Sequence, residues 1–224
     1  MKVTWLGQAG LLLERKGFKI LVDPYLSDSC ERLSDKNRRR MPIDKRFLEF
    51  RPDMIICTHN HLDHLDPDTL KHYLTEDSGI TVLCSENGFH EARKFGGSNN
   101  YVMMRPGTEW TEGGFVFSAV SAEHSELSAI GIIIDDGEEK YYITGDTLYN
   151  KYIFDELPED IHALFLPVNG VGNNMNMADA ARFAEEVGTD VTVPLHWGLF
   201  DSLDPAECKC KNKRILKIYE EAEI

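Results

Sequence analysis

The sequence predicts sheet layers covered by helices, an α/β or α+β sandwich, on three observations. Short apolar runs of strand length occur along the whole chain. In the N-terminal third they are joined by tight turns, whereas helical patterns alternate with the later runs. The 224 residues, 42% of them hydrophobic, are enough for one substantial core and few for two. We therefore expect a single domain over residues 1–224.

Ten apolar runs predict the strands. They are Val3–Leu6, Leu11–Leu13, Ile20–Val22, Met54–Cys57, Thr81–Cys84, Phe115–Val120, Ile130–Ile134, Tyr141–Ile143, Ala163–Val168 and Val191–Leu195. Residues 26–46 lack such a pattern and are polar and basic. A loop of that length in a compact domain is often a lid or a binding loop.

Capping signals predict three helices. The first begins at Asp66-Pro67, and the second is capped by Asn176 and ends at Gly188. The apolar face of the second helix repeats at helical spacing and comprises Ala180, Phe183, Ala184 and Val187. A third helix is expected from Asp204-Pro205-Ala206-Glu207. Its later part is expected to bury Ile215, Ile218, Tyr219 and Ala222.

Charge and composition limit the classes of partner. The formal net charge of -14 repels phosphate backbones, so we expect no nucleic-acid partner. No apolar run approaches the ~20 residues that span a bilayer, so we expect no membrane segment. The chain starts directly with strand-like residues, and a cytoplasmic protein with reduced thiols is expected. A homo-oligomer is left open.

The five cysteines are odd in number, which does not suggest a disulfide framework. Cys208 and Cys210 form a Cys-x-Cys pair, but no further Cys or His lies nearby to complete a metal site. We expect one of these two thiols to pack and the other to be exposed, and we assign the pair no function.

The segment Thr58-His-Asn-His-Leu-Asp-His64 is the strongest functional signal. It places His59, His61, Asp63 and His64 within six positions, directly after a buried apolar run. Imidazoles and a carboxylate suit divalent zinc, manganese or iron. Four ligands so close in sequence can hardly all bind one ion with relaxed geometry. We therefore expect two ions, with further ligands from elsewhere in the chain.

Three other strand ends carry suitable side chains. His124 follows the run 115–120, Asp146 follows 141–143, and His196 follows 191–195. Sites in α/β proteins form where the C-terminal ends of strands meet. Taken singly, each side chain has a structural alternative, for example Asp146 as a turn residue. The remaining histidines, which are His72, His90 and His162, fall in helical stretches or before a strand and are left out.

The order of these residues resembles that of the metallo-β-lactamase-fold hydrolases. The resemblance rests on His-x-His-x-Asp-His at 59–64, His124, Asp146 in Thr-Gly-Asp-Thr, and His196, and it spans most of the chain. The chain is more closely similar to the L-ascorbate-6-phosphate lactonase-like branch. That similarity rests on TWLGQAG at 4–10, LVDPYLS at 21–27, PVNG at 167–170, GNNMN at 172–176 and PLHW at 194–197.

The resemblance implies an α+β fold, a four-layer αβ/βα sandwich with the metals at one edge of the two sheets. Carried over by position, His59, His61 and His124 would hold the first metal. Asp63, His64 and His196 would hold the second, and Asp146 would bridge the two. Asp23 would accept a hydrogen bond that orients a ligand histidine. The alternative for Asp23 is that Asp23-Pro24 simply ends a strand.

These features predict a metal-dependent hydrolase that opens an ester or a lactone. Two ions would lower the pKa of a shared water and polarise the carbonyl, and Asp63 would handle the proton. The sequence contains no Gly-x-Ser-x-Gly elbow that would supply a protein nucleophile. Two alternatives remain: a phosphodiesterase or nuclease on the same metal site, and a non-enzymatic metal or ligand sensor.

The expected partner is a small-molecule substrate, with a sugar-phosphate lactone as one option. Guanidinium groups and backbone N–H groups suit phosphate. The residues that could bind one are Arg38, Arg39, Arg40, Asn169, Asn173 and Asn174. The alternative is a basic surface patch beside a solvated turn.

Overall fold

The computed structural model describes residues 1–224, which form two compact units, each built on one sheet. The first unit comprises residues 1–103, 198–202 and 216–224. The second comprises residues 104–197 and 203–215. The prediction of a single domain over 1–224 stays a prediction.

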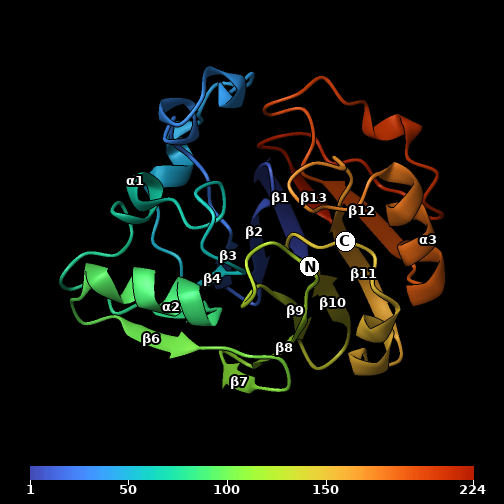
Figure 1. Ribbon diagram of the computed structural model, residues 1–224. Helices are drawn as coiled ribbons and strands as arrows, with labels where there is room; N and C mark the ends of the chain where they lie inside the picture. The colour runs from blue at the N-terminus through green and yellow to red at the C-terminus, as the bar shows by residue number, and fades with distance from the viewer. The chain divides into compact units, whose positions relative to one another are not determined.

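The first unit carries a seven-stranded sheet in the order β13-β1-β2-β3-β4-β5-β6. The strands are β1 (Lys2–Gly7), β2 (Gly10–Arg15), β3 (Phe18–Val22), β4 (Met54–Cys57), β5 (Thr81–Cys84), β6 (Asn100–Met103) and β13 (Glu221–Glu223). From β13 to β3 neighbouring strands are antiparallel, and from β3 to β6 they are parallel. The helix α2 (Glu86–Ala92) lies beside β5 and β6 (Figure 1).

Short helices fill the connections of this unit. The α-helix α1 (Pro67–Leu70) begins as predicted, because Asp66 caps it and Pro67 occupies its first turn. The region 26–46 contains the 3-10 turns Cys30–Arg32 and Asp35–Asn37, and Lys45–Leu48 follows. Another 3-10 turn, Arg93–Phe95, continues α2.

The second unit carries a six-stranded sheet in the order β12-β11-β10-β9-β8-β7. The strands are β7 (Glu109–Glu112), β8 (Phe115–Ser121), β9 (Ile130–Asp135), β10 (Lys140–Ile143), β11 (Ile161–Pro167) and β12 (Val191–Leu195). The strands β10, β11 and β12 are parallel to one another, whereas β7, β8, β9 and β10 alternate in direction. β8 therefore runs in the same direction as β10, and the loops after β8, β10, β11 and β12 leave the same edge.

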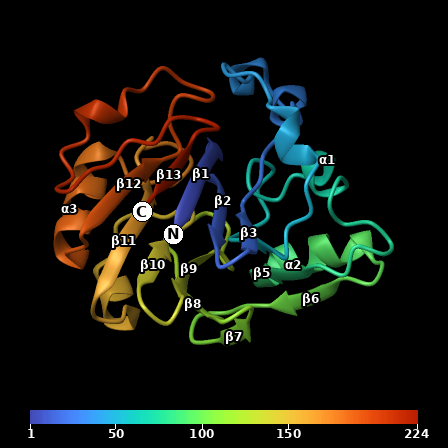
Figure 2. The same ribbon diagram turned by 180° about the vertical axis from the view of Figure 1, so that it is seen from behind.

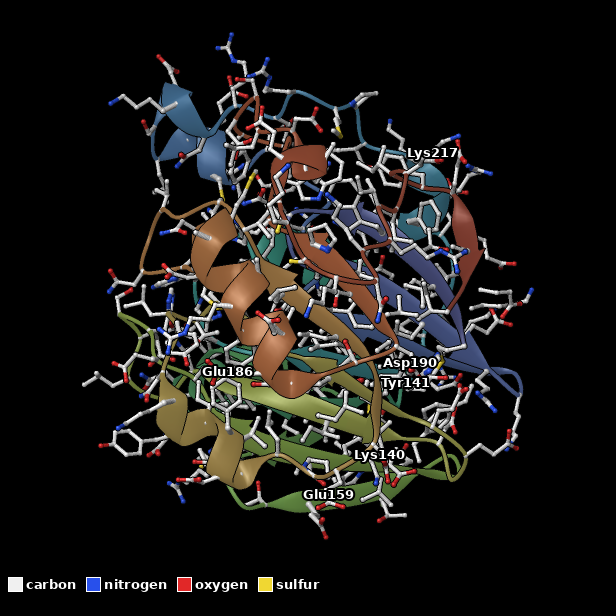
Figure 3. The ribbon with its side chains drawn as sticks, turned by 90° about the vertical axis from the view of Figure 1, so that its right-hand side faces the viewer. Lys140, Tyr141, Glu159, Glu186, Asp190 and Lys217 are labelled. Atoms are coloured by element: carbon white, nitrogen blue, oxygen red, sulfur yellow. The ribbon has the colours of Figure 1, made fainter.

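The helix α3 (Met177–Val187) packs beside β11, the neighbour of the edge strand β12 (Figure 2). Asn176 caps α3 and Gly188, at φ 73°, ends it, as the sequence predicts. Figure 3 looks onto this helix and labels Glu186 in its last turn and Asp190 beyond it. Phe183 is fully buried, with its ring 4.9 Å from that of Phe154 in the 3-10 helix Lys151–Glu156.

All ten predicted strands are present, but the third predicted helix is wrong. Only the 3-10 turn Pro205–Glu207 forms, and Cys208 already has an extended backbone. Ile215 is 40% exposed, and residues 221–223 form strand β13 instead. His162, expected before its strand, lies within β11. No helix in the structure combines the length and the apolar character that crossing a bilayer requires.

Replacing Phe183 by alanine should lower the free energy of unfolding by about 3–5 kcal/mol, because the change leaves a cavity in the core beneath α3. Urea unfolding followed by circular dichroism measures this. Glu185→Ala, on the exposed side of the same helix, is the control and should change the unfolding midpoint little, because it removes only a surface ion pair with Lys211. Equal unfolding midpoints for the two variants would show that α3 does not depend on this aromatic packing.

Candidate metal centre

In the first unit, the predicted ligands follow two neighbouring parallel strands. β3 ends at Val22 and is followed by Asp23, while β4 ends at Cys57 and is followed by Thr58 and His59. The backbone N–H of Asp23 donates to the carbonyl of Ile56 at 2.9 Å, which continues the pairing of the two strands. Asp23 and the histidine-rich loop therefore leave the sheet side by side.

Asp23 is fully buried and accepts three hydrogen bonds from this loop. Its Oδ1 accepts from the backbone N–H of Thr58 at 2.8 Å, and its Oδ2 accepts from the Thr58 hydroxyl at 2.6 Å. Nδ1 of His64 lies 2.8 Å from the same Oδ2. Because an ionised carboxylate only accepts, Nδ1 of His64 carries the hydrogen and Nε2 presents its lone pair.

Thr58 orients His59 in the same way. Its hydroxyl hydrogen points to Asp23, so the hydroxyl oxygen accepts from Nδ1 of His59 at 3.2 Å. Nε2 of His59 therefore also presents a lone pair. The His59 ring lies 4.5 Å from that of His61 and 4.1 Å from that of His64. In both pairs a ligating atom of one ring lies within 4.8 Å of one on the other.

Asp63 belongs to the same group of donors. One of its carboxylate oxygens lies within 4.8 Å of a ring nitrogen of His64. Its Oδ2 accepts from Nε2 of Gln8 at 3.0 Å. Gln8 lies in the β1–β2 turn with φ 48° and is 2% exposed. The sequence analysis missed this contact, because only the folded hairpin brings residue 8 to residue 63.

In the second unit, the three remaining predicted ligands follow β8, β10 and β12 at one edge of the sheet. Nε2 of His196 lies 3.3 Å from Oδ2 of Asp146. Nδ1 of His124 lies 3.2 Å from the carbonyl oxygen of Asn173. A carbonyl only accepts, so Nδ1 of His124 carries the hydrogen and Nε2 presents the lone pair. All three side chains are buried.

Asn169 orients His196. Its Nδ2 lies 2.9 Å from Nδ1 of His196, and its Oδ1 is buried without a hydrogen-bond partner. Rotation of the amide would place Oδ1 against Nδ1 of His196, so that Nδ1 carries the hydrogen and Nε2 the lone pair. Asn174 is 4% exposed, and neither amide atom has a partner. Of the three predicted substrate-binding asparagines, two thus contact candidate ligands.

The predicted phosphate-binding arginines have partners within the first unit. Nε of Arg38 donates to Glu31 at 2.7 Å. Arg39 donates to the Tyr25 carbonyl at 2.9 Å and to the Tyr219 hydroxyl at 3.2 Å. Arg39 thus ties its loop to the C-terminal segment, whereas Arg38 sits in an exposed pair. A substrate contact of either arginine stays a prediction.

The donor set in each unit fits a divalent cation of the zinc or manganese type. It combines imidazoles held in one tautomer with carboxylates, the ligands that these ions take in proteins. The three histidines that were left out of the prediction do not belong to either donor set. His162 pairs with Asp190 at 3.2 Å, and His72 and His90 are exposed.

Replacing Asp23 by alanine should lower the affinity for zinc or manganese by about 10–100-fold, because His64 and Thr58 lose the acceptor that orients them. Competition with a coloured chelator measures this affinity. Asp53→Ala is the matched control. Asp53 directly precedes β4, at the end of the strand away from the histidines, and its carboxylate accepts from the backbone N–H of Lys19. An unchanged affinity in Asp23→Ala would show that the tautomers are set by other groups.

Known proteins resemble this chain in sequence and in fold. The β-lactamase superfamily domain matches residues 19–197. A UPF0173 protein of Pyrococcus furiosus is 27% identical over 100% of both chains. A UPF0173 metal-dependent hydrolase of Methanopyrus kandleri is 29% identical over 93% of this chain and 90% of its own.

The solved structure of Igni18, a metallo hydrolase from Ignicoccus hospitalis, has a TM-score of 0.76 and 21% identity, and covers 99% of this chain and 97% of its own. This likeness confirms the predicted α+β fold class. The lactonase-like branch stays a prediction. Because the domain match spans most of the sequence, the chain belongs to the β-lactamase superfamily.

Proposed function

We propose that this chain is a metal-dependent hydrolase that opens an ester or a lactone, with two divalent ions of manganese or zinc and iron as the third candidate. One observation carries the proposal. In both units, histidines at strand ends donate through Nδ1 to an internal acceptor and so present Nε2 as a ligand. Such preset tautomers are typical of metal-binding histidines.

The assignment of ligands follows the order of residues in the superfamily. His59, His61 and His124 would hold one ion, Asp63, His64 and His196 the other, and Asp146 both. In this proposal the two units act as one hydrolase domain over 1–224. Membership of the superfamily and the chemistry of the donors within each unit support it.

The metal ions, when bound, would supply the Lewis acidity that activates water and polarises the carbonyl of the substrate. The residues of the chain orient the ligands and move the proton. Asp63 is held through Oδ2 by the buried Gln8 amide. We assign its carboxylate the role of taking a proton from the attacking water and passing it to the leaving alkoxide.

The thiol of Cys30, which is close enough to Asp63 to feel its charge, is not suited to act as a protein nucleophile. Burial, and then the carboxylate of Asp63, raise the pKa of the Cys30 thiol to about 11. This thiol is therefore protonated at neutral pH, and the protonated form is a poor nucleophile. Hydrolysis by water, without a covalent enzyme intermediate, is the mechanism that the chain supports.

A pocket in the first unit supports a small-molecule substrate. Its volume is about 420 Å³, within the range of ligand sites. Asn60 and Leu62 of the histidine-rich loop form one wall, and Phe95 and other apolar side chains line the rest. Lys94 and Glu91 also line the pocket and pair with each other at 2.6 Å, so together they add no net charge to it. We infer that this pocket takes an apolar part of the substrate.

The Asp63→Asn variant should hydrolyse aryl esters and lactones about 10²–10⁴-fold more slowly than the wild type, because the proton acceptor is lost while an oxygen ligand remains. The kcat/KM of protein loaded with manganese or zinc measures this, together with its metal content. Asp68→Asn, half-buried at the start of α1 and paired with Arg32, is the control and should keep its activity.

Two outcomes would contradict the proposal. A wild-type protein that holds two ions and cleaves only bis-p-nitrophenyl phosphate would be a phosphodiesterase. A wild-type protein that holds two ions and cleaves neither class of ester would be a metal-binding or ligand-binding protein without catalytic activity.

We also propose, more narrowly, a sugar-phosphate lactone as the substrate, as in the lactonase-like branch. Arg38→Ala should then lower kcat/KM for a phosphorylated lactone and leave that for a neutral lactone unchanged, because the guanidinium–phosphate contact is lost and the exposed pair with Glu31 does not touch the substrate. Arg38 is the better test, because Arg39 already holds Tyr25 and Tyr219. If the variant and the wild type have the same kcat/KM for the phosphorylated lactone, and also for the neutral lactone, Arg38 does not contact the substrate.

A further inference from the structure

Two cysteines in the second unit are used neither by the metal centre nor by the proposed hydrolysis. Sγ of Cys208 lies 2.9 Å from Sγ of Cys210, closer than sulfur atoms in ordinary van der Waals contact. Cys208 is 0% exposed and Cys210 8% exposed. Both thiols are therefore buried, and the expectation that one of them would be exposed is wrong.

The loop around the two thiols is closely tied. Nζ of Lys213 donates to the carbonyls of Pro205, Ala206 and Cys208 at 3.1, 2.7 and 2.6 Å. The backbone of Thr192 in β12 donates to the Asn212 carbonyl at 3.0 Å and accepts from Arg214 at 2.8 Å. In Figures 1 and 2 this segment, drawn in red after β12, passes one end of α3. These hydrogen bonds fix the backbone on both sides of the two thiols.

The two thiols differ in acidity. The hydrogen bond from Cys210, with a smaller contribution from the Lys213 ammonium group, lowers the pKa of the Cys208 thiol to about 6. The same hydrogen bond, and then burial, raise the pKa of the Cys210 thiol. The hydrogen bond between the two sulfur atoms therefore favours a thiolate at Cys208 beside a thiol at Cys210, the combination found in reactive dithiols.

The other cysteines lack this combination. Cys57 and Cys84 are paired across β4 and β5 in the core, and their hydrogen bond and burial raise the pKa of Cys57 well above its usual value. The Cys30 thiol also has a raised pKa, of about 11. The reactive form is therefore favoured at residue 208.

We propose that Cys208 and Cys210 form a redox site, which a small hydroperoxide oxidises to a reversible internal disulfide. The Cys208 thiolate attacks one peroxide oxygen, the O–O bond breaks, and a sulfenic acid and hydroxide form. The sulfur of Cys210 then attacks the sulfur of Cys208, the S–OH bond breaks, and water leaves. In sum, two thiols lose two electrons and two protons, and hydrogen peroxide becomes two waters.

The geometry requires little movement for the second step. The sulfur atoms must approach by about 0.9 Å to reach a disulfide bond of about 2.04 Å. The burial of both thiols selects a small oxidant such as hydrogen peroxide over a bulky disulfide. Sγ of Cys208 also lies 3.6 Å from the carbonyl oxygen of Met177, in the first turn of α3.

The test is a peptide map of the full-length protein after treatment with a small excess of hydrogen peroxide. Free thiols are alkylated in denaturant, and a protease specific for glutamate cuts after Glu207 and Glu220. The fragment 208–220 then contains only these two cysteines. We expect it to lose two hydrogen atoms in mass, to resist alkylation, and to recover both thiols on reduction with dithiothreitol.

Variants and competing products decide the outcome. Cys208→Ser should abolish the loss of two hydrogens, whereas Cys30→Ser, the control, should retain it. If Cys208→Ser does not fold, the wild-type map decides alone. A 208–220 fragment alkylated at both thiols after peroxide would overturn the proposal. So would purified wild-type protein in which a soft metal ion occupies the pair and is lost in Cys208→Ser.

Discussion

The buried carboxylate of Asp23 is the contact on which the candidate metal centre of the first unit depends. One carboxylate holds the backbone and hydroxyl of Thr58 and the ring of His64, and through Thr58 it also orients His59. A buried carboxylate is costly unless its oxygens are satisfied, and here they accept three hydrogen bonds. The loop after β4 is therefore held in one arrangement, with two imidazole lone pairs ready before any ion arrives.

In the second unit, the candidate ligand histidines are oriented by a backbone carbonyl and a side-chain amide instead of a carboxylate. Both groups belong to the segment between β11 and α3, which provides the Asn173 carbonyl for His124 and the Asn169 amide for His196. In both units, the ligands leave strands that run in the same direction, so the sheets themselves bring distant residues to one edge. Such rigid supports suit a site whose atoms must keep fixed positions.

Local patterns in the sequence predicted much of this arrangement. The bounds of β4 and β12 and the caps Asp66 and Asn176 depend on adjacent residues, and all four are as expected. The edge strands β6, β7 and β13 were missed, because each has only three or four residues and depends on hydrogen bonds from a neighbouring strand; β7 and β13 are also mostly polar. The third helix failed because Lys213 binds the carbonyls that a helix would need for its own N–H groups. The contacts of Gln8, Asn169 and Arg39 join residues far apart in sequence, so no local pattern could show them.

The strand β13 has a consequence for the edge of the first sheet. An unpaired edge strand offers a row of N–H and C=O groups to which another polypeptide can add. Here the outermost strand has only three residues, and Glu221 and Glu223 are both exposed. A short border strand with charged side chains, here paired with Lys2 and the N-terminal ammonium group, discourages edge-to-edge aggregation, and it covers the apolar strand β1 behind it.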